Sequence, residues 1–152
     1  MTCRLCRAPL GAPVLDLGHA PPANAYLRPE DLSRPELHLP LRLHLCPACG
    51  LAQTVHTAPP EEIFTSDYVY FSSASASWCA HAARFAQGAA ARLGLGAGSF
   101  VVEVASNDGY LLRNFVAAGI PCLGIEPTRS TADAARAAGV PTETAFFGAA
   151  LG

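Results

Sequence analysis

Residues 100–127 hold the feature that most constrains the fold of this chain. An apolar run ends in the acid Glu103, a short polar turn follows, and a second apolar run ends in another acid, Glu126. Between them lies a segment with the pattern of an amphipathic helix. The pattern predicts a strand–turn–helix–strand unit with a carboxylate at the carboxyl end of each strand. Open α/β sheets bind ligands at that edge, and paired carboxylates suit the hydroxyls of a nucleoside.

The expected fold class is therefore α/β, with further elements on both sides of this unit. The expected elements are a helix over residues 78–95, a strand over 100–104, a helix over 110–118, a strand over 122–126, a helix over 130–138 and a strand beginning at 142. Leu111, Leu112, Phe115 and Val116 are expected to form the buried side of the second helix, and Ser130 to cap the third. Two or three parallel strands are less than a complete doubly wound sheet. We expect the chain to be an incomplete N-terminal portion of a longer protein; the alternative is a compact domain with an unusual edge.

Composition narrows the classes of function. Of the 152 residues, 51% are hydrophobic and 14% are charged, which is typical of a globular chain. The net charge of -2 gives no electrostatic reason to expect nucleic acid or a membrane surface as a partner. The amino terminus lacks the apolar core of a signal peptide, so we expect a cytoplasmic protein with reduced cysteines.

Four of the six cysteines form two CxxC pairs, Cys3 with Cys6 and Cys46 with Cys49. Two such turns supply the four thiolates that a structural zinc site needs, although unrelated pairs or disulfides are the alternative. Gly50 can adopt the positive φ that often follows the second cysteine, whereas Arg7 at the equivalent place predicts a weaker first turn.

The region around these pairs is expected to be extended. The 39 residues between Cys6 and Cys46 predict an inserted hairpin or loop, and residues 37–45 alternate like a half-buried strand. Pro40 in that strand favours an edge position. Cys79 and Cys122 are expected to be core residues without a metal.

The turn after the first strand carries the candidate cofactor site. Glu103 is expected near the amino acid part of a cofactor, and Ala105 and Gly109 keep the turn small enough for close approach. Asn107 and Asp108 are expected either to hydrogen-bond the cofactor or to fix the turn.

Glu126, at the end of the second strand, is expected to accept both ribose hydroxyls of the cofactor. A dinucleotide is the rival ligand, but its site requires a G-x-G-x-x-G turn that this sequence lacks. Asp108 would also repel a phosphate. The sulfonium cofactor S-adenosylmethionine therefore fits better than a dinucleotide.

The order of motifs resembles a known family. The paired cysteines, the segment LGHAPPANAYL at 17–27, the segment DYVYFSS at 67–73 and EVASNDGYLL followed by GIEP are similar to S-adenosylmethionine-dependent sugar C-methyltransferases. The resemblance implies a zinc-binding domain over 1–66, a linker and connecting helix over 67–97, and the N-terminal part of a Rossmann-like class I methyltransferase domain over 98–152.

The resemblance also implies a reaction. A base removes the proton next to the ketone of a dTDP-linked 4-keto-deoxysugar, and the enolate attacks the methyl group of S-adenosylmethionine. Tyr68 and Tyr70 are expected to support the site, or else to pack in the linker, and Asn24 and Tyr26 to belong to the sugar side. The catalytic base is expected beyond residue 152, so the isolated chain should be inactive. A stand-alone zinc-ribbon module and a methyltransferase of another substrate class remain alternatives, and the sequence predicts no oligomeric state.

Overall fold

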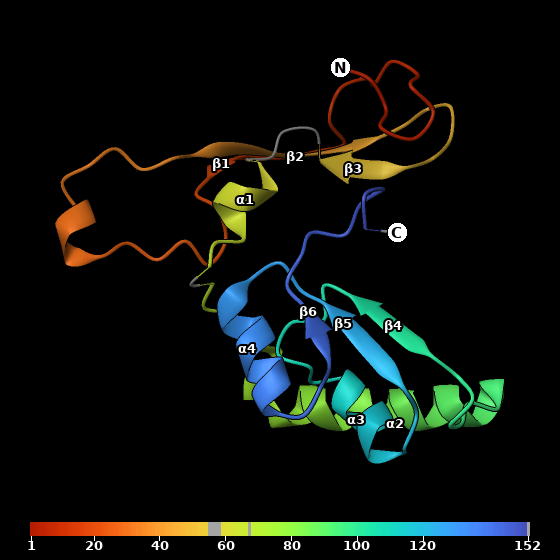
Figure 1. Cartoon of the computed structure of the whole chain (residues 1–152). Helices are drawn as coiled ribbons and strands as arrows, with labels where there is room; N and C mark the ends of the chain where they lie inside the picture. Colours follow the sequence, from red (N-terminus) through yellow and green to blue (C-terminus); the bar gives the residue numbers. More distant parts are fainter. Residues whose placement is uncertain (55–58, 67, 152) are drawn as a thin grey trace. The chain divides into compact units, whose positions relative to one another are not determined.

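The computed structural model describes residues 1–54, 59–66 and 68–151 and is of mixed α/β type. It divides into two compact units, Met1–Ile63 and Phe64–Gly152 (Figure 1). Asp67, the first residue of the DYVYFSS segment, lies outside the described residues, as does Gly152. Among the helices of the described residues, none is long and apolar enough to cross a membrane.

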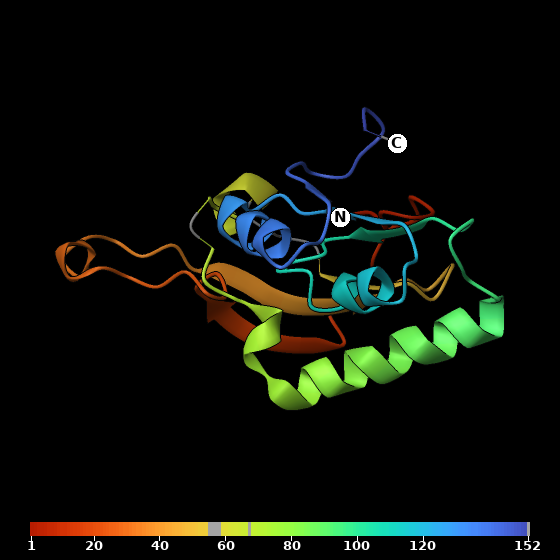
Figure 2. The ribbon, with the colours of Figure 1, turned by 60° about the horizontal axis from the view of Figure 1, so that its bottom comes forward.

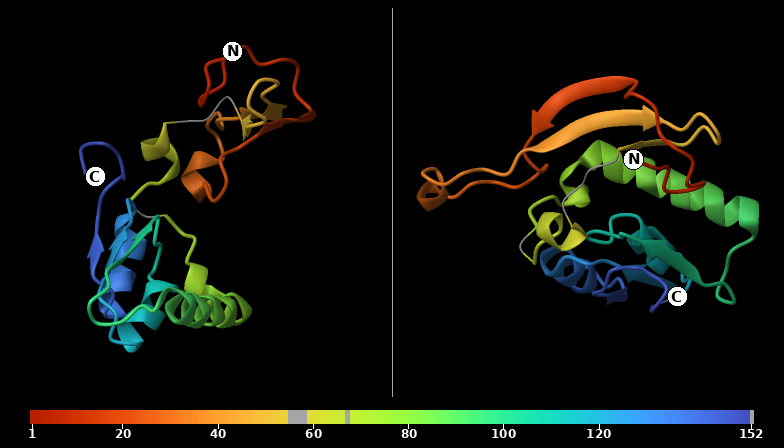
Figure 3. Two further views of the ribbon diagram at one scale, coloured as in Figure 1. Left: turned by 90° about the vertical axis from the view of Figure 1, so that its right-hand side faces the viewer. Right: turned by 90° about the horizontal axis from the view of Figure 1, so that it is seen from above.

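The first unit is built on a three-stranded antiparallel sheet in the order β1-β2-β3. Its elements are β1 (Leu15–Ala20), the 3-10 helix η1 (Pro29–Asp31), β2 (Leu39–Leu45), β3 (Ala52–Thr54) and the short helix α1 (Pro60–Ile63). β1 and β2 form a hairpin whose long connection carries η1 (Figure 3). This hairpin lies between the two cysteine pairs, where the spacing predicts an insertion.

The predicted edge position of Pro40 is wrong, because β2 is the central strand. Pro40 pairs with His19 of β1, whereas β3 pairs only with the far end of β2, at Leu43 to Leu45. On the side of β2 that faces β3, the lack of an N–H at Pro40 therefore costs no hydrogen bond, because β3 does not reach this residue. The sheet tolerates the proline because β3 is only 3 residues long.

The second unit contains a three-stranded parallel sheet in the order β4-β5-β6. Its elements are the 3-10 helix η2 (Ser72–Ala74), α2 (Ala76–Leu93), β4 (Val101–Val104), α3 (Leu112–Ala117), β5 (Cys122–Ile125), α4 (Arg129–Ala137) and β6 (Thr142–Glu143). The predicted order of elements holds, and the strand expected to begin at 142 comprises only Thr142–Glu143. The long helix α2 lies alongside α3 (Figure 2).

Local signals explain where the helices begin and end. Ser75 caps α2, since its Oγ accepts the N–H of Trp78, and Gly94 ends the helix with a φ of 63°. The prediction that Ser130 caps α4 is wrong. Thr128 is the N-cap residue, and Ser130 instead donates its hydroxyl to the carbonyl of Tyr68 at 2.8 Å. Ser130 thus ties the segment before α2 to α4.

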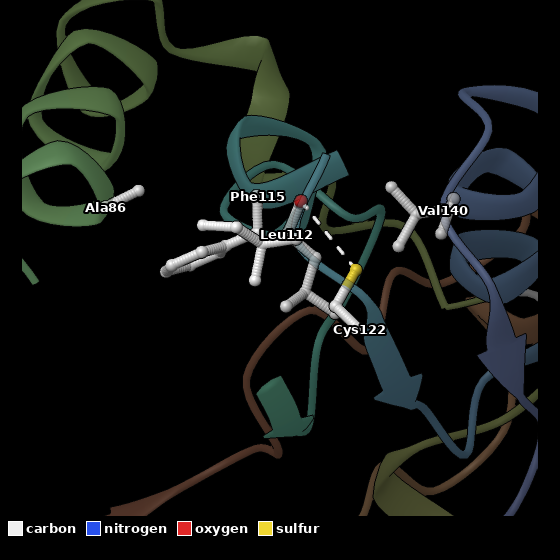
Figure 4. Packing of buried hydrophobic residues seen from close by; sticks show 7 residues of the cluster. Ala86, Leu112, Phe115, Cys122 and Val140 are labelled. Carbon is white, nitrogen blue, oxygen red and sulfur yellow. Dashed lines mark hydrogen bonds between the residues drawn. The ribbon is translucent and has the colours of Figure 1, made fainter. Parts of the chain in front are cut away.

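An apolar core joins helices α2, α3 and α4 of the second unit to β5 (Figure 4). Leu112 is fully buried and Phe115 nearly so, and they pack with Ala86 of α2 and Cys122 of β5. Val116, which the helical pattern places on the buried side, is instead 38% exposed. The buried face of α3 is centred on Leu112 and Phe115, and Val116 lies outside it.

The two remaining cysteines differ in burial. Cys122 is a core residue, as predicted, and its thiol lies 4.0 Å from the carbonyl of Leu112. Cys79 is only partly buried, and its thiol contacts the carbonyl of Ser73. Cys79 therefore faces η2, and its side chain does not belong to the apolar core of the described residues.

Candidate functional site: a four-cysteine centre and a sheet edge

The four paired cysteines come together in the first unit. The sulfurs of Cys3, Cys6, Cys46 and Cys49 all lie within 4.8 Å of one another. Cys3 and Cys49 are separated by 3.7 Å between their sulfurs, and Cys6 and Cys46 by 3.5 Å. A disulfide needs about 2.0 Å. A tetrahedral zinc with bonds of about 2.3 Å places its sulfurs roughly 3.8 Å apart. The cluster thus fits a zinc ion and not a disulfide framework.

Two turns of the same design present these sulfurs. In the first, the N–H of Cys3 donates to the carbonyl of Ala8 at 2.8 Å. In the second, the N–H of Cys46 donates to the carbonyl of Leu51 at 2.9 Å, five residues on in each case. Each turn therefore has the same backbone hydrogen bond and contributes two of the four sulfurs to the metal centre.

Both turns also contain a residue in the left-handed region after the second cysteine. Gly50 has a φ of 75°, and Arg7 has a φ of 64°. The backbone N–H groups of these residues donate to the carbonyls of Cys46 and Cys3. The sequence therefore locates the positive φ at both positions, and the first turn achieves it with a non-glycine residue.

The surroundings of the cluster favour the thiolate at Cys3 and Cys46, whereas, against the backbone N–H of Leu51, burial and the neighbouring cysteine sulfurs raise the pKa of Cys49 to about 12. The backbone N–H of Cys6 lowers the pKa of the Cys3 thiol to about 6, against the opposing effect of burial, and the Gln53 carboxamide adds to this lowering. The backbone N–H of Cys49 likewise lowers the pKa of Cys46. Because zinc binds the thiolate, these donors favour metal binding near neutral pH.

Two buried polar residues flank the cluster on paired strands. His44 of β2 pairs with Gln53 of β3, and both side chains are buried. The Nδ1 atom of His44 lies 3.0 Å from the carbonyl of Gly11. His44 is therefore tied to the chain between the first turn and β1, and it does not join the four sulfurs as a ligand in the described cluster.

In the second unit, the predicted cofactor turn follows β4 at the carboxyl edge of the parallel sheet. The N–H of Ala105 donates to the carbonyl of Ile125 at 2.8 Å, which joins the turn to the end of β5. Ala105 and Asn107 have φ values of 59° and 51°. Two non-glycine residues in the left-handed region mark a backbone that its hydrogen bonds hold in an unfavourable shape.

Glu126 fixes this turn through its carboxylate, which accepts a backbone hydrogen bond from it. It is 4% exposed, and its Oε2 accepts the N–H of Asn107 at 2.9 Å. Its Oε1 accepts from the N–H of Thr128 at 2.9 Å and from the Thr128 hydroxyl. Both oxygens already serve protein donors, so the predicted contact with ribose would use their remaining lone pairs. That contact stays a prediction.

Asn107 and Asp108 fasten the turn to the DYVYFSS segment. The Asn107 side chain accepts the N–H of Ser72 at 2.8 Å and donates to the carbonyl of Tyr70 at 2.9 Å. Asp108 accepts the N–H of Ser73 at 3.0 Å. Of the two roles considered for this pair, the structure displays turn fixation. It also brings together two motifs that are far apart in sequence.

Glycines allow the close packing around the turn. A Cβ at Gly109 would lie 2.9 Å from the side chain of Val140, and its φ is 75°. A Cβ at Gly124 would lie within 3.0 Å of both the Oγ and Cβ atoms of Ser106. Protein packing thus requires both glycines. The sequence offers no signal that pairs Ser106 with Gly124, because their contact arises only from strand register.

Glu103 is one of two acids at this edge that have a buried oxygen without a hydrogen-bond partner among the described residues. Its Oε2 is buried and has no partner among the described residues, and the same holds for Oδ1 of Asp108 and Oγ of Ser106. Burial, followed by the charge of Glu126, raises the pKa of Glu103 to about 7. The edge therefore presents acceptor oxygens without protein donors, as a ligand site requires.

Aromatic residues border this edge. The Trp78 and Tyr110 rings are 6.0 Å apart, and Trp78 stacks on His81 at 5.2 Å. Burial and then the charge of Glu103 raise the pKa of Tyr110. Trp78 and Tyr110 were expected only as helix residues, and no local pattern distinguishes them.

Tyr68 and Tyr70, which were predicted to support the site, lie in the segment before α2. Tyr70 is 51% exposed and contributes its carbonyl to Asn107. Tyr68 packs edge-on against Phe64 at 5.5 Å. Asn24 and Tyr26 belong to the first unit, where Tyr26 is 78% exposed. The roles predicted for these four residues at a substrate site stay predictions.

Comparison with known proteins supports the zinc-binding interpretation of the first unit. Residues 3–64 match a family model described as "Putative zinc binding domain". The chain is also 33% identical over 150 residues to the C-methyltransferase NovU of Streptomyces niveus. That alignment covers 99% of this chain and 36% of the relative, so the chain spans about a third of the relative's length. Residues 3–64 are thus similar to a putative zinc-binding domain, and the chain is similar, along nearly its whole length, to part of a C-methyltransferase.

Proposed function

We propose that this chain is part of a cytoplasmic S-adenosylmethionine-dependent C-methyltransferase. Its first unit would be a structural zinc domain, and its second unit would begin a Rossmann-like methyltransferase domain. The proposed substrate is a dTDP-linked 4-keto-deoxysugar, methylated on the carbon next to the ketone. Similarity to a C-methyltransferase over 150 residues is the observation that carries the proposal.

The parallel sheet supports a Rossmann-like assignment. β4, β5 and β6 are neighbours in chain order, with α3 and α4 as the connections between them. Such connections are nearly always right-handed, so successive crossovers in one direction place their helices on one face. The core agrees with this layout, because Leu112 of α3 and Ala135 of α4 belong to the same buried cluster.

The polar edge of the sheet supports a cationic, phosphate-free cofactor. Glu103 and Asp108 each have a buried oxygen without a donor in the described part of the chain, and Glu126 lies next to them at the end of β5. Three neighbouring carboxyl groups would repel a pyrophosphate but attract an ammonium or a sulfonium group. This favours S-adenosylmethionine over a dinucleotide.

When bound, S-adenosylmethionine supplies an activated methyl group on its sulfonium. In the proposal this chain binds and orients that group. Glu126 keeps the turn in its strained shape, and the bonds from Asn107 and Asp108 to the DYVYFSS segment close one side of the site. The base that takes the proton next to the ketone is assigned to a part of the enzyme other than these 152 residues.

The decisive experiment measures cofactor binding by the polypeptide that carries these residues. Isothermal titration with S-adenosylhomocysteine should detect binding, and Glu126→Gln should weaken it about 10- to 100-fold, as loss of a charged hydrogen bond does. Glu143→Gln, which removes an exposed carboxylate from β6, is the matched control and should bind normally. Absence of binding by the unaltered protein would contradict the proposal.

Substrate and rival functions need separate measurements. Transfer of a labelled methyl group to a dTDP-4-keto-deoxysugar tests the substrate class, and transfer only to other acceptors would replace it. Rapid turnover by the isolated 152-residue chain would contradict the assignment of the base elsewhere. Salt-sensitive binding of nucleic acid, without cofactor binding, would favour a stand-alone zinc-ribbon module.

A further inference from the structure

The side chain of Gln53 connects β3 to the first cysteine turn. Its Nε2 atom donates to the sulfur of Cys3 at 3.2 Å, and its Oε1 accepts the N–H of Arg4 at 3.1 Å. The side chain is 6% exposed. Arg4 adds a second link to the same strand, since its guanidinium donates to the carbonyl of Thr54. The turn is thus held against β3 by a buried amide.

The partners of the amide determine its orientation. The N–H of Arg4 can only donate, so it requires an oxygen opposite it. The remaining NH₂ group must then face the sulfur of Cys3. The flipped amide would place an oxygen against the sulfur and an NH₂ group against a backbone N–H, and both contacts would be repulsive.

The second cysteine turn has no equivalent residue. Cys46 and Cys49 receive backbone N–H groups, but within the described parts of the chain no side-chain amide donates to either sulfur. The two turns otherwise share the backbone bonds described above. Gln53 therefore acts on one specific sulfur of the four.

We propose that Gln53 is a positioning residue of the zinc site, which donates a hydrogen bond to the Cys3 thiolate and locks the first turn onto β3. Zinc with four thiolates has a net charge of about -2, so each N–H donor to a sulfur stabilises the loaded site. Partners of metal ligands typically change affinity 10- to 100-fold. The inference deepens the structural zinc role in the proposed function and rests on it.

Two substitutions separate the donor from the rest of the side chain. Gln53→Glu keeps an oxygen for the N–H of Arg4 but replaces the donor to Cys3 with a negatively charged oxygen. Gln53→Met keeps the bulk and removes both bonds without adding charge. Gln87→Glu makes the same chemical change at an exposed position of α2 in the second unit and is the matched control.

Zinc affinity of the full chain is measured by competition with a chromophoric chelator. We expect Gln53→Glu to weaken zinc binding about 10- to 100-fold, Gln53→Met to weaken it less, and Gln87→Glu to leave it unchanged. With cobalt in place of zinc, the sulfur-to-cobalt charge-transfer band should shift in both Gln53 variants, because the charge on one thiolate changes. Circular dichroism at saturating zinc shows whether each variant folds; where Gln53→Glu does not, Gln53→Met decides.

Three results would overturn the inference. One is equal zinc affinity and an unshifted cobalt band in the Gln53 variants and the control. Another is a Gln53→Glu protein that binds as well as the wild type while Gln53→Met does not, because packing and the Arg4 bond would then explain the site. Failure of the unaltered chain to bind zinc would instead remove the zinc centre itself.

Discussion

The two units of this chain are held together by different interactions. The buried residues described in the first unit are Cys3, Cys46, His44 and Gln53, so its interior is made of metal ligands and polar groups. The second unit has an apolar core that centres on Leu112, in addition to the buried polar residues at its sheet edge. A unit without an apolar core depends on its metal for folding, whereas one with such a core does not.

The hairpin of the first unit illustrates this dependence. Leu15 and Leu17 of β1 and Leu45 of β2 are 48%, 61% and 50% exposed, so the alternating pattern of these strands buries little apolar surface. The sequence alternation alone cannot stabilise three short strands. The cysteine turns supply the missing stabilisation by fixing the base of the hairpin.

Removal of zinc should produce the largest effect and should be confined to the first unit. Structural zinc in small domains contributes an apparent 10–16 kcal/mol at neutral pH, about as much as the whole stability of a small domain. Chelation should abolish the dispersed NMR signals of β1 to β3 and preserve those of β4 to β6. Fluorescence of the single tryptophan, Trp78 in α2, should change little. Loss of both sets of signals would contradict the conclusion that only the first unit depends on zinc for folding.

Substitution of Leu112 by Ala should produce the reverse pattern. The side chain is fully buried in the core of the second unit, so its truncation should cost about 2–5 kcal/mol. Urea unfolding followed by Trp78 fluorescence should shift to lower denaturant, while zinc affinity stays constant. Val116→Ala on the same helix, where the side chain is 38% exposed, is the control and should shift the midpoint far less.

Acid and base should affect the units in opposite directions. The raised pKa of Glu103, about 7 against an ordinary 4.5, means that the folded second unit holds its proton more tightly than the unfolded chain. This stabilisation is complete below pH 4.5 and is lost as pH rises through 7. The first unit should instead release zinc in acid, as its thiolates gain protons.

Glu103→Gln tests the pH dependence that is expected for the second unit. Urea titration at several pH values gives the free energy of unfolding of both proteins. As pH rises from 5 to 8, the wild type should lose stability relative to the variant, because only the wild type loses the proton of Glu103. A difference that is constant with pH would show that Glu103 titrates as an exposed acid.

The smallest expected effect concerns the first cysteine turn. Arg7 has a φ of 64°, which costs a non-glycine residue about 1–2 kcal/mol, and the more flexible unfolded state of a glycine offsets part of any gain. Arg7→Gly should therefore tighten zinc binding only about twofold by chelator competition. A weaker site would show that the arginine side chain contributes to the turn, contrary to the expectation that it is the less suitable residue.

Local patterns identified most of this molecule. Paired cysteines, the positive φ after each pair, and the strand–turn–helix–strand order can each be deduced from neighbouring residues, because turns and periodicity are properties of short segments. The two wrong predictions about position, for Pro40 and Val116, arose because local patterns carry no information about distant elements. Pro40 and Val116 were misplaced because the number of neighbouring strands and the width of a buried stripe depend on distant elements.

The sequence by itself determined the ligand set of the metal centre and the acids at the sheet edge, since both follow from residue type and spacing. Only the tertiary structure decided what holds them. It brought Gln53 to the sulfur of Cys3, Glu126 beneath Asn107, and Ser106 over the bare face of Gly124. These contacts join residues separated by between 18 and 50 positions, as from Ser106 to Gly124 and from Cys3 to Gln53. Their physical basis is strand register and chain crossing, which no short stretch of sequence encodes.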